Sequence, residues 1–146
     1  MTMPFANPAA GLPRDISEDS EKSPTARILV VDDDRLVRWA MAETLGAKGY
    51  EISEAADVES AKRAILAHGA PDLVILDLRL PGCGDFCMVS FIRAQTPNAP
   101  IVLTTADLTP EVIEQAAHLG AVVVSKPFDM NDLTSIVGRA LAPRSA

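Results

Sequence analysis

The chain has 146 residues, 48% of them hydrophobic, and its 13 Lys and Arg against 20 Asp and Glu give a formal net charge of −7. The length fits one domain, and the hydrophobic fraction is too high for a wholly disordered chain. The negative charge argues against binding to a nucleic-acid backbone, and no apolar run reaches the roughly 18 residues that a membrane span needs.

The composition of residues 1–26 predicts a mobile polar arm. They are rich in Pro, Ser, Ala and charged residues, and they lack the apolar stretch of a secretory signal, so the expected location is the cytoplasm. One domain is expected over residues 27–141, followed by a short tail over residues 142–146. Cys83 and Cys87 are too few for a disulfide framework or a zinc site, so we expect free thiols.

From Arg27 onwards, apolar runs alternate with segments whose apolar residues recur at helical spacing. Continuous apolar runs predict strands buried on both faces, and an alternating run predicts an edge strand. Asp57, Thr109 and Asp129 are predicted helix N-caps. In chain order, the predicted elements are a strand over Ile28–Val31, a helix over Leu36–Leu45, an edge strand over Tyr50–Glu54, a helix from Asp57 to about His68, a strand over Leu73–Leu76, a helix over Phe86–Arg93, a strand over Ile101–Leu103, a helix from Thr109 to Leu119, a strand over Val122–Val124 and a helix from Asp129 to about Leu141.

This alternation predicts an α/β fold. Strands separated by helices of about 10–15 residues form right-handed βαβ units around a parallel sheet. Five strands and five helices fit the flavodoxin-like doubly wound sheet, whose strand order is 2-1-3-4-5. The second strand, which alternates apolar and polar residues, is then expected at an edge of the sheet.

Polar side chains gather where the predicted buried strands end. The carboxyl ends of parallel strands share one edge of the sheet, and open α/β sheets bind ligands there, at the switch point between the first and third strands. The residues concerned are Asp32, Asp33 and Asp34 after the first strand, Asp77 after the third, Thr104 and Thr105 at the end of the fourth, and Ser125 and Lys126 at the end of the fifth. The competing interpretation is that Asp34, or one of its two neighbours, is only a helix N-cap.

The acidic residues of this edge predict a magnesium site. Neighbouring strands are about 4.8 Å apart, so Asp32, Asp33 and Asp77 are expected to converge within several ångströms. Carboxylates so close repel each other unless a cation compensates. Mg²⁺ fits better than zinc, because carboxylate oxygens suit it and no His or Cys is nearby. Together with Lys126 and the Thr105 hydroxyl, the set suits the handling of a phosphoryl group.

Four segments at these strand ends resemble the signature blocks of a response-regulator receiver domain. The similarity covers about Arg27 to Leu141. Arg35–Trp39 is also similar to receivers of the nitrogen-regulation type. The four blocks are Val30–Asp34, Leu76–Gly82, Leu103–Ala106 and Ser125–Phe128.

The resemblance implies a role for each residue of the acidic cluster. Asp77 would be the phosphoacceptor, taking a phosphoryl group from the phosphohistidine of a sensor histidine kinase or a histidine phosphotransfer protein. Asp33 and Asp77 would bind Mg²⁺ directly together with the backbone carbonyl of Arg79, and Asp32 would act partly through water. Positioning and charge neutralisation would then carry the rate, since phosphoryl transfer needs little covalent chemistry from the protein.

The resemblance also implies which residues hold and sense the phosphoryl group. Lys126 would bind a phosphoryl oxygen, Thr105 would move to hydrogen-bond the group, and Ala106 would leave room for that approach. The Lys126–Pro127 peptide bond would be cis, as in the family, although only about 5–6% of X–Pro bonds are cis in general.

Three positions depart from the family pattern. Val123 stands where the family usually has a Tyr or Phe that swings inward on activation, so an aromatic switch is not expected. Gly84–Asp85 stands where the family usually reads Asp-Gly, so this loop is expected to differ, with Asp85 as a helix N-cap. Arg79 and Asp107 flank the phosphoryl site, and we hypothesise that they pair across it and obstruct the hydrolytic water. The competing interpretation is that they are two solvated charges.

The expected function is that of a stand-alone receiver, a signalling domain that assists its own phosphorylation and dephosphorylation rather than an enzyme. An aspartyl-nucleophile phosphatase is one alternative, because Asp32 and Asp34 have the required spacing, but no cap insertion fits this length. A second alternative is a pseudo-receiver that only binds partners, which the complete set of site residues disfavours.

Partner switching is expected on the fourth helix, fifth strand and fifth helix, roughly Thr109–Leu141, which the family uses for effectors and homodimers. Trp39 is either a kinase contact or partly buried in the core. Neither direct nucleic-acid binding nor membrane association is expected of this chain, because of its charge and because no DNA-binding helix-turn-helix follows Leu141.

Overall fold

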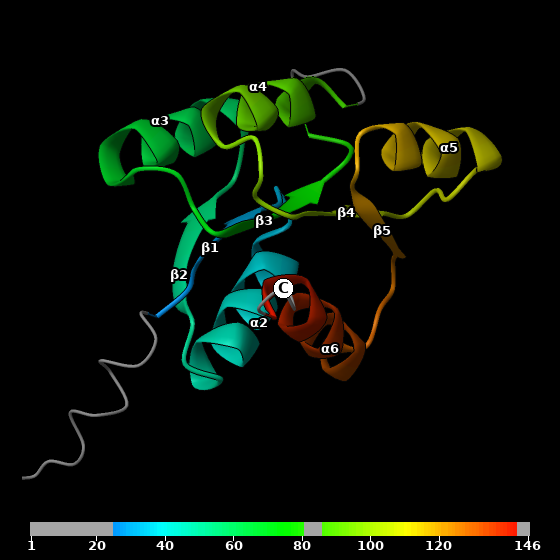
Figure 1. The fold of residues 1–146 in the computed structure, drawn as a ribbon. Helices are drawn as coiled ribbons and strands as arrows, with labels where there is room; N and C mark the ends of the chain where they lie inside the picture. The colour runs from blue at the N-terminus through cyan, green and yellow to red at the C-terminus, as the bar shows by residue number, and fades with distance from the viewer. Residues whose placement is uncertain (1–24, 81–85, 143–146) are drawn as a thin grey trace, which may run out of the picture.

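The computed structural model of the protein describes residues 25–80 and 86–142. Within these residues, five parallel strands form one sheet in the order β2-β1-β3-β4-β5 (Figure 1). The strands are β1 (Arg27–Val31), β2 (Glu51–Ala55), β3 (Leu73–Asp77), β4 (Ile101–Thr105) and β5 (Val122–Ser125).

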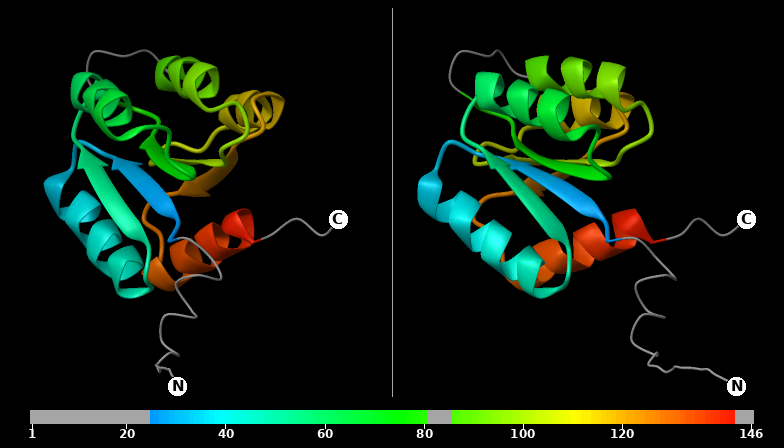
Figure 2. Two further views of the ribbon diagram at one scale, coloured as in Figure 1. Left: turned by 60° about the vertical axis from the view of Figure 1, so that its left-hand side comes forward. Right: turned by 90° about the vertical axis from the view of Figure 1, so that its left-hand side faces the viewer.

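Five helices of the described residues cover the two faces of the sheet (Figure 1, Figure 2). They are α2 (Arg35–Ala47), α3 (Val58–His68), α4 (Cys87–Gln95), α5 (Pro110–His118) and α6 (Met130–Leu141). α3, α4 and α5 lie on one face, and α2 and α6 lie on the other. The predicted flavodoxin-like arrangement is therefore confirmed, with β2 at an edge. None of these helices is both long and apolar enough to cross a membrane.

Some predictions lie outside what the structure describes. These are most of the arm over residues 1–26, most of the tail over residues 142–146, the thiols of Cys83 and Cys87, and the loop residues Gly84–Asp85. The domain boundaries and the cap at Asp85 therefore stay predictions. The described helix α4 begins at Cys87, and Phe86 before it adopts a φ of 68° and provides no side-chain cap.

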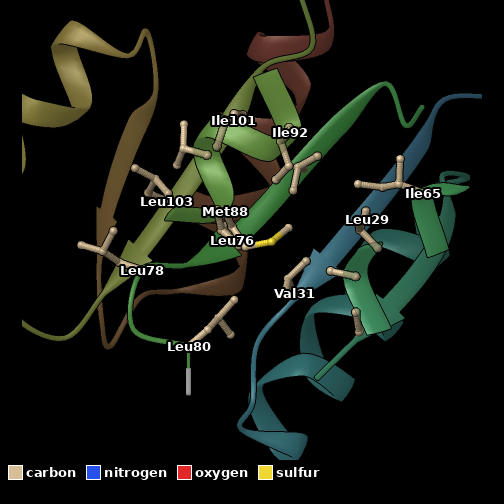
Figure 3. Packing of buried hydrophobic residues seen from close by; sticks show 14 of the residues in the cluster. Leu29, Val31, Ile65, Leu76, Leu78, Leu80, Met88, Ile92, Ile101 and Leu103 are labelled. Atoms are coloured by element: carbon tan, nitrogen blue, oxygen red, sulfur yellow. The ribbon is translucent and has the colours of Figure 1, made fainter. Parts of the chain in front are cut away.

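Alternate residues of the strands pack into two separate hydrophobic cores. Leu29, Val31 and Leu76 belong to the core under α3, α4 and α5, where Ile65 and Ile92 lie over the strands (Figure 3). The residues between them belong to the second core, which α2 and α6 cover. The fully buried side chains of this second core include Ile28, Val30, Ile75, Met41, Leu45 and Leu133. Because burying one such side chain stabilises the fold by about 1.5–3 kcal/mol, the two cores fix the pleat and thereby the direction of every residue at the sheet edge.

Side-chain caps fix where three of the helices begin. The Asp57 carboxylate accepts a hydrogen bond from the Ser60 amide (2.8 Å), which forms a capping box at the start of α3. The Thr109 hydroxyl accepts from the third amide after it (3.2 Å), and the Asp129 carboxylate accepts from the second amide after it (2.7 Å). All three predicted N-caps are confirmed, since each oxygen satisfies an amide that has no partner inside the helix.

The strands end later than the apolar runs predicted. The parallel ladder continues through the polar residues, where Asp77 pairs with Thr104 and Thr105 pairs with Ser125. Asp77 is thus the last residue of β3 rather than the residue after it, and the two threonines extend β4 beyond its predicted end at Leu103. β2 is shifted by one position from its predicted bounds, because the Tyr50 amide still bonds to the Leu45 carbonyl in the turn that closes α2 (3.4 Å).

Two apolar residues of α2 do not join the core. Leu36 is one of the apolar residues at helical spacing in this segment, but its side chain is 73% exposed, and it lies in the first turn of α2. Trp39, one turn further, is 57% exposed. Trp39 packs against neither core, so its predicted partial burial in the core is wrong, whereas its contact with a kinase stays a prediction.

Candidate functional site

Two of the predicted aspartates reach the carboxyl edge of the sheet from neighbouring strands. Asp32 follows Val30 by two positions and Asp77 follows Ile75 by two, and both apolar residues belong to the core covered by α2 and α6. Since alternate strand residues share a face, both carboxylates lie on the α2 side of the edge. β1 and β3 are hydrogen-bonded neighbours, so this is the switch point of the sheet.

Asp32, Asp33 and Asp77 form one carboxylate cluster. One oxygen from each lies within 4.8 Å of the others. Asp32 is fully buried, Asp77 is 7% exposed and Asp33 is exposed. Three carboxylates beside one ammonium leave excess negative charge in a partly dry pocket, and oxygen donors of this kind are what a hard divalent cation prefers. The residues present therefore fit Mg²⁺.

Lys126 is the ammonium that faces this cluster. Its Nζ lies 3.1 Å from Asp32 Oδ2 and 3.4 Å from Asp77 Oδ2. Burial of the ammonium works to lower the pKa of Lys126, but hydrogen bonding and charge from Asp32, reinforced by Asp77, outweigh burial and raise that pKa. The side chain is therefore a permanent positive charge, suited to an anionic oxygen brought to Asp77.

Opposing influences act on the pKa of the Asp77 carboxyl. Burial is the largest influence and raises the pKa of the Asp77 carboxyl above its ordinary value. The Arg79 amide, which donates to Asp77 Oδ1 (3.1 Å), and the positive charge of Lys126 only partly oppose it. Further positive charge beside Asp77 would favour the ionised form, which nucleophilic attack requires.

The three aspartates of the turn after β1 make different contacts. Asp32 Oδ1 accepts from the Asp34 amide (2.8 Å), so both carboxylate oxygens of Asp32 already have partners inside the protein. Asp34 Oδ1 accepts from the amides of Leu36 and Val37 (3.0 and 3.2 Å). The interpretation of Asp34 as a helix N-cap is therefore confirmed, and the exposed Asp33 is left as the most accessible carboxylate of the turn.

The residues after β4 and β3 meet beside Asp77. Thr105 is fully buried, and its hydroxyl accepts from the Asp107 amide (3.1 Å). The Arg79 guanidinium pairs with the Asp107 carboxylate (2.9 Å), with both side chains about 60% exposed. The predicted pairing is present in the structure, although its influence on hydrolysis stays a prediction. A pair so exposed contributes at most about 1 kcal/mol to stability.

Space remains next to Lys126 on the side of Ala106. A mostly apolar pocket of about 300 Å³ opens there, lined by Ala106, Lys126, Val37 and Phe128 among others. Ala106 itself is exposed, and the Lys126–Pro127 bond is cis as predicted. Val123, at the position of the family's usual aromatic residue, is half-buried against the core under α5.

Two further residues contribute to the site, and only Thr104 is among the polar residues that the sequence places at this edge. Arg38 donates to the backbone carbonyl of Asp32 (2.7 Å), and Thr104, in register with Asp77, buries a hydroxyl for which the described residues provide no hydrogen-bond partner. The structure places Thr104 directly beside Asp77 in the parallel ladder. The Arg38 contact had no comparable signal, because it depends on the tilt of α2 against the end of β1.

Comparison with known proteins agrees with this geometry. A family model described as the response regulator receiver domain matches residues 28–138. Among curated proteins, the DNA-binding transcriptional regulator NtrC of Bradyrhizobium sp. (strain RP501 Parasponia) is 34% identical over 120 residues, which cover 82% of this chain and 25% of that protein. The chain thus spans about a quarter of the length of that relative.

Solved structures give the same fold. The chemotaxis protein CheY4 of Vibrio cholerae superimposes with a TM-score of 0.74 at 30% identity, covering 80% of this chain and 99% of that one. The receiver domain of NtrX from Brucella abortus superimposes with a TM-score of 0.71 at 34% identity, covering 78% of this chain and 97% of that one. The similarity to NtrC and NtrX agrees with the resemblance of Arg35–Trp39 to nitrogen-regulation receivers.

Proposed function

The chain belongs to the response regulator receiver domain family, and from that premise we propose that it accepts a phosphoryl group on Asp77 in two-component signalling. The observation that carries the proposal is the cluster of Asp32, Asp33 and Asp77 within 4.8 Å of one another, with Lys126 Nζ 3.4 Å from Asp77. Receiver domains are signalling domains rather than classical enzymes, so a lasting covalent adduct is expected, not turnover.

In the proposed reaction, a carboxylate oxygen of Asp77 attacks the phosphorus of a phosphohistidine on a sensor kinase or a phosphotransfer protein. A phosphorus–oxygen bond forms while the phosphorus–nitrogen bond breaks, and the electron pair of the broken bond returns to the imidazole. Lys126 already touches Asp77 and would bind a phosphoryl oxygen as the charge moves. Little covalent work is left to the protein, so position and charge supply most of the rate.

Asp33, Asp77 and the backbone carbonyl of Arg79 would hold Mg²⁺. Asp32, whose two oxygens already accept from Asp34 and Lys126, would act partly through water. When bound, the ion supplies charge neutralisation for the carboxylates and the phosphoryl oxygens. The positive charge of the ion would also oppose the effect of burial, which raises the pKa of the Asp77 carboxyl.

We further propose that Thr105, Ala106 and Val123 respond to the modification. The Thr105 hydroxyl would release the Asp107 amide, 3.1 Å away, and turn toward the phosphoryl group. The open space beside Ala106 would admit that movement. Val123 has no ring to swing inward, so the signal would travel through Thr105 and the loop after it, supported by the hydrogen bond from the Lys126 amide to the Thr105 carbonyl (2.7 Å).

The proposed partner surface consists of α5, β5 and α6. Ile113 and Val122 on this surface are 52% and 47% exposed. A groove of about 710 Å³ between β5 and α6, lined in part by Ser125 and Ile136, adds shape to it. Homodimerisation or effector binding through this surface is proposed, with the cytoplasm as the expected location and no direct contact with nucleic acid by this chain.

Incubation with Mg²⁺ and acetyl phosphate, followed by intact-mass measurement, tests the proposal. The wild type is expected to gain one phosphoryl group, and Asp77→Asn is expected to gain none. Asp34→Asn is a matched control on the same turn, because asparagine also caps a helix and should leave the adduct intact. Rapid turnover of added phosphoesters would indicate a phosphatase, and the absence of any adduct would indicate a pseudo-receiver.

A further inference from the structure

Arg38, on the first turns of α2, reaches back to the acidic turn that follows β1. Its Nη1 donates to the backbone carbonyl of Asp32 (2.7 Å), and its Nε donates to Glu54 Oε1 on β2 (3.2 Å). The side chain is only 16% exposed. A guanidinium held by two partners on different elements has little freedom, so it acts as a fixed brace between β2 and the turn.

The Asp32 carbonyl needs this partner. The Asp32 amide makes the last bond of the β1–β2 ladder, donating to the Ala55 carbonyl (3.1 Å), and the chain then turns toward α2. A buried carbonyl at that point must be satisfied from outside the ladder, or its desolvation is uncompensated. Arg38 therefore fixes the peptide unit that joins Asp32 to Asp33.

That peptide unit determines where the Asp33 carboxylate lies. Within residues 25–80 and 86–142, no ion pair or hydrogen bond restrains this carboxylate, which is exposed but within 4.8 Å of the other two. Its direction is consequently set by the backbone of the turn. Metal sites depend on such outer contacts, whose loss typically weakens affinity by about 10–100-fold.

We propose that Arg38 is a positioning residue that presets the Asp32–Asp33 turn for a divalent cation, with Glu54 holding the guanidinium in place. The inference rests on the proposed Mg²⁺ site. It goes further because it assigns a role in Mg²⁺ binding to Arg38, whose positive charge alone would oppose that binding.

Arg38 has two expected effects on Mg²⁺ affinity, one through its charge and one through its contact with the turn, and they act in opposite directions. Removing a positive charge beside three carboxylates would by itself tighten Mg²⁺ binding. Loosening the turn would weaken it, because the free site must then be ordered when the ion binds. Geometry is expected to prevail, since the guanidinium contacts the turn directly while its charge is already shared with Glu54.

Titration of the 146-residue chain with Mg²⁺, followed by calorimetry and by the NMR chemical shift of the Asp33 amide, tests the proposal. Arg38→Met is expected to weaken Mg²⁺ binding about 10-fold. Arg35→Met is the matched control, because Arg35 is an exposed cation three residues earlier on the same helix, and its removal should leave affinity unchanged or slightly tighter. Arg38→Gln, which is as neutral as Arg38→Met but keeps a donor, is expected to bind more tightly than Arg38→Met.

Phosphorylation by acetyl phosphate provides the second readout. The rate of Arg38→Met at saturating Mg²⁺ is expected to approach that of the wild type, with the loss confined to low Mg²⁺. A folded Arg38→Met chain that binds Mg²⁺ as tightly as the wild type, or more tightly, overturns the proposal. If Arg38→Met does not fold, Arg38→Lys provides the test, because lysine keeps the positive charge but lacks the planar guanidinium that bonds two partners. Wild-type Mg²⁺ affinity in Arg38→Lys would then overturn the proposal. If the wild type itself binds no Mg²⁺, the proposed function fails with it.

Discussion

Arg79 and Asp107 approach the phosphoryl position through their backbones as well as their side chains. The Arg79 amide donates to Asp77 Oδ1 and the Asp107 amide donates to Thr105 Oγ1, while the two side chains pair at 2.9 Å. The ion pair is thereby tied to the residue that would be phosphorylated and to the one that would respond. The ion pair contributes little to stability, so we expect its effect in the rate of dephosphorylation.

Arg79→Ala is expected to shorten the half-life of the phosphorylated chain several-fold, because the pair would no longer obstruct the water that attacks the acyl phosphate. Asp107→Ala should act in the same direction. The decay of the adduct, followed by intact mass after removal of the phosphodonor, measures this. A half-life in Arg79→Ala that is unchanged or longer would contradict the role and support two solvated charges.

Thr104 and Thr105 are a natural matched pair, since both are fully buried but only one hydroxyl has a partner among the described residues. Thr104→Val is expected to leave stability unchanged or to increase it by about 1 kcal/mol, because valine carries no hydroxyl to desolvate. Thr105→Val is expected to lower stability by about 1 kcal/mol, because the Asp107 amide loses its acceptor. Urea unfolding of both variants measures the difference. Destabilisation by Thr104→Val would show that its hydroxyl has a partner, such as a buried water.

At the scale of elements, local signals placed helix starts well wherever a capping side chain was present. Asp57, Thr109 and Asp129 each accept the expected amide. α4 shows the opposite case, because its cap position is Phe86 in a left-handed conformation, which no residue preference would predict. Local sequence signals thus locate the start of a helix where a side chain caps it, and α4 begins without such a side-chain cap.

The start of α5 offers a test at this scale, since this helix follows directly on the loop after Thr105. Thr109→Ala is expected to cost about 1 kcal/mol, because the Val112 amide loses the hydroxyl that caps it at 3.2 Å. This corresponds to a decrease in Tm of about 4 °C. Thr109→Ser keeps the hydroxyl and should retain most of the stability. Equal melting temperatures for the wild type and Thr109→Ala would mean that Pro110 and packing alone define the helix start.

The candidate site followed from the sequence only in part, and the division has a physical cause. The sequence pattern shows where the strands end, and it therefore places Asp32, Asp77 and Lys126 at one edge of the sheet. Contacts that cross between elements at a specific tilt could not, and the Arg38 brace on Asp32 is the clearest example. Leu36 shows the same limit, since helical spacing identifies an apolar stripe but not where the sheet stops covering it.

For the whole molecule, Asp77 links stability to pH and to divalent cations. Burial raises the pKa of its carboxyl in the folded state, so the folded chain binds this proton more tightly than the unfolded chain does. The contribution of the Asp77 carboxyl to the free energy of unfolding therefore falls as pH rises from the ordinary carboxyl range through the raised pKa. A cation that binds the folded state alone reverses the loss by mass action.

Asp77→Asn is accordingly expected to raise the Tm of the Mg²⁺-free chain at neutral pH. The difference from the wild type should shrink as pH falls below the ordinary aspartate range, where both side chains are neutral. Added Mg²⁺ should stabilise the wild type more than the variant. Thermal melts over a pH series, with and without Mg²⁺, measure both effects. A lower Tm for Asp77→Asn at neutral pH without Mg²⁺ would contradict the direction assigned to this carboxyl.

The most direct measurement of the central claim is the position of the phosphoryl group on the chain. Treatment with acetyl phosphate and Mg²⁺, then borohydride, reduces an aspartyl phosphate to homoserine, and peptide fragmentation locates the changed residue. We expect homoserine at position 77 alone, formed only when Mg²⁺ is present. Homoserine at position 32 or 33, or an Mg²⁺-independent adduct elsewhere, would contradict it.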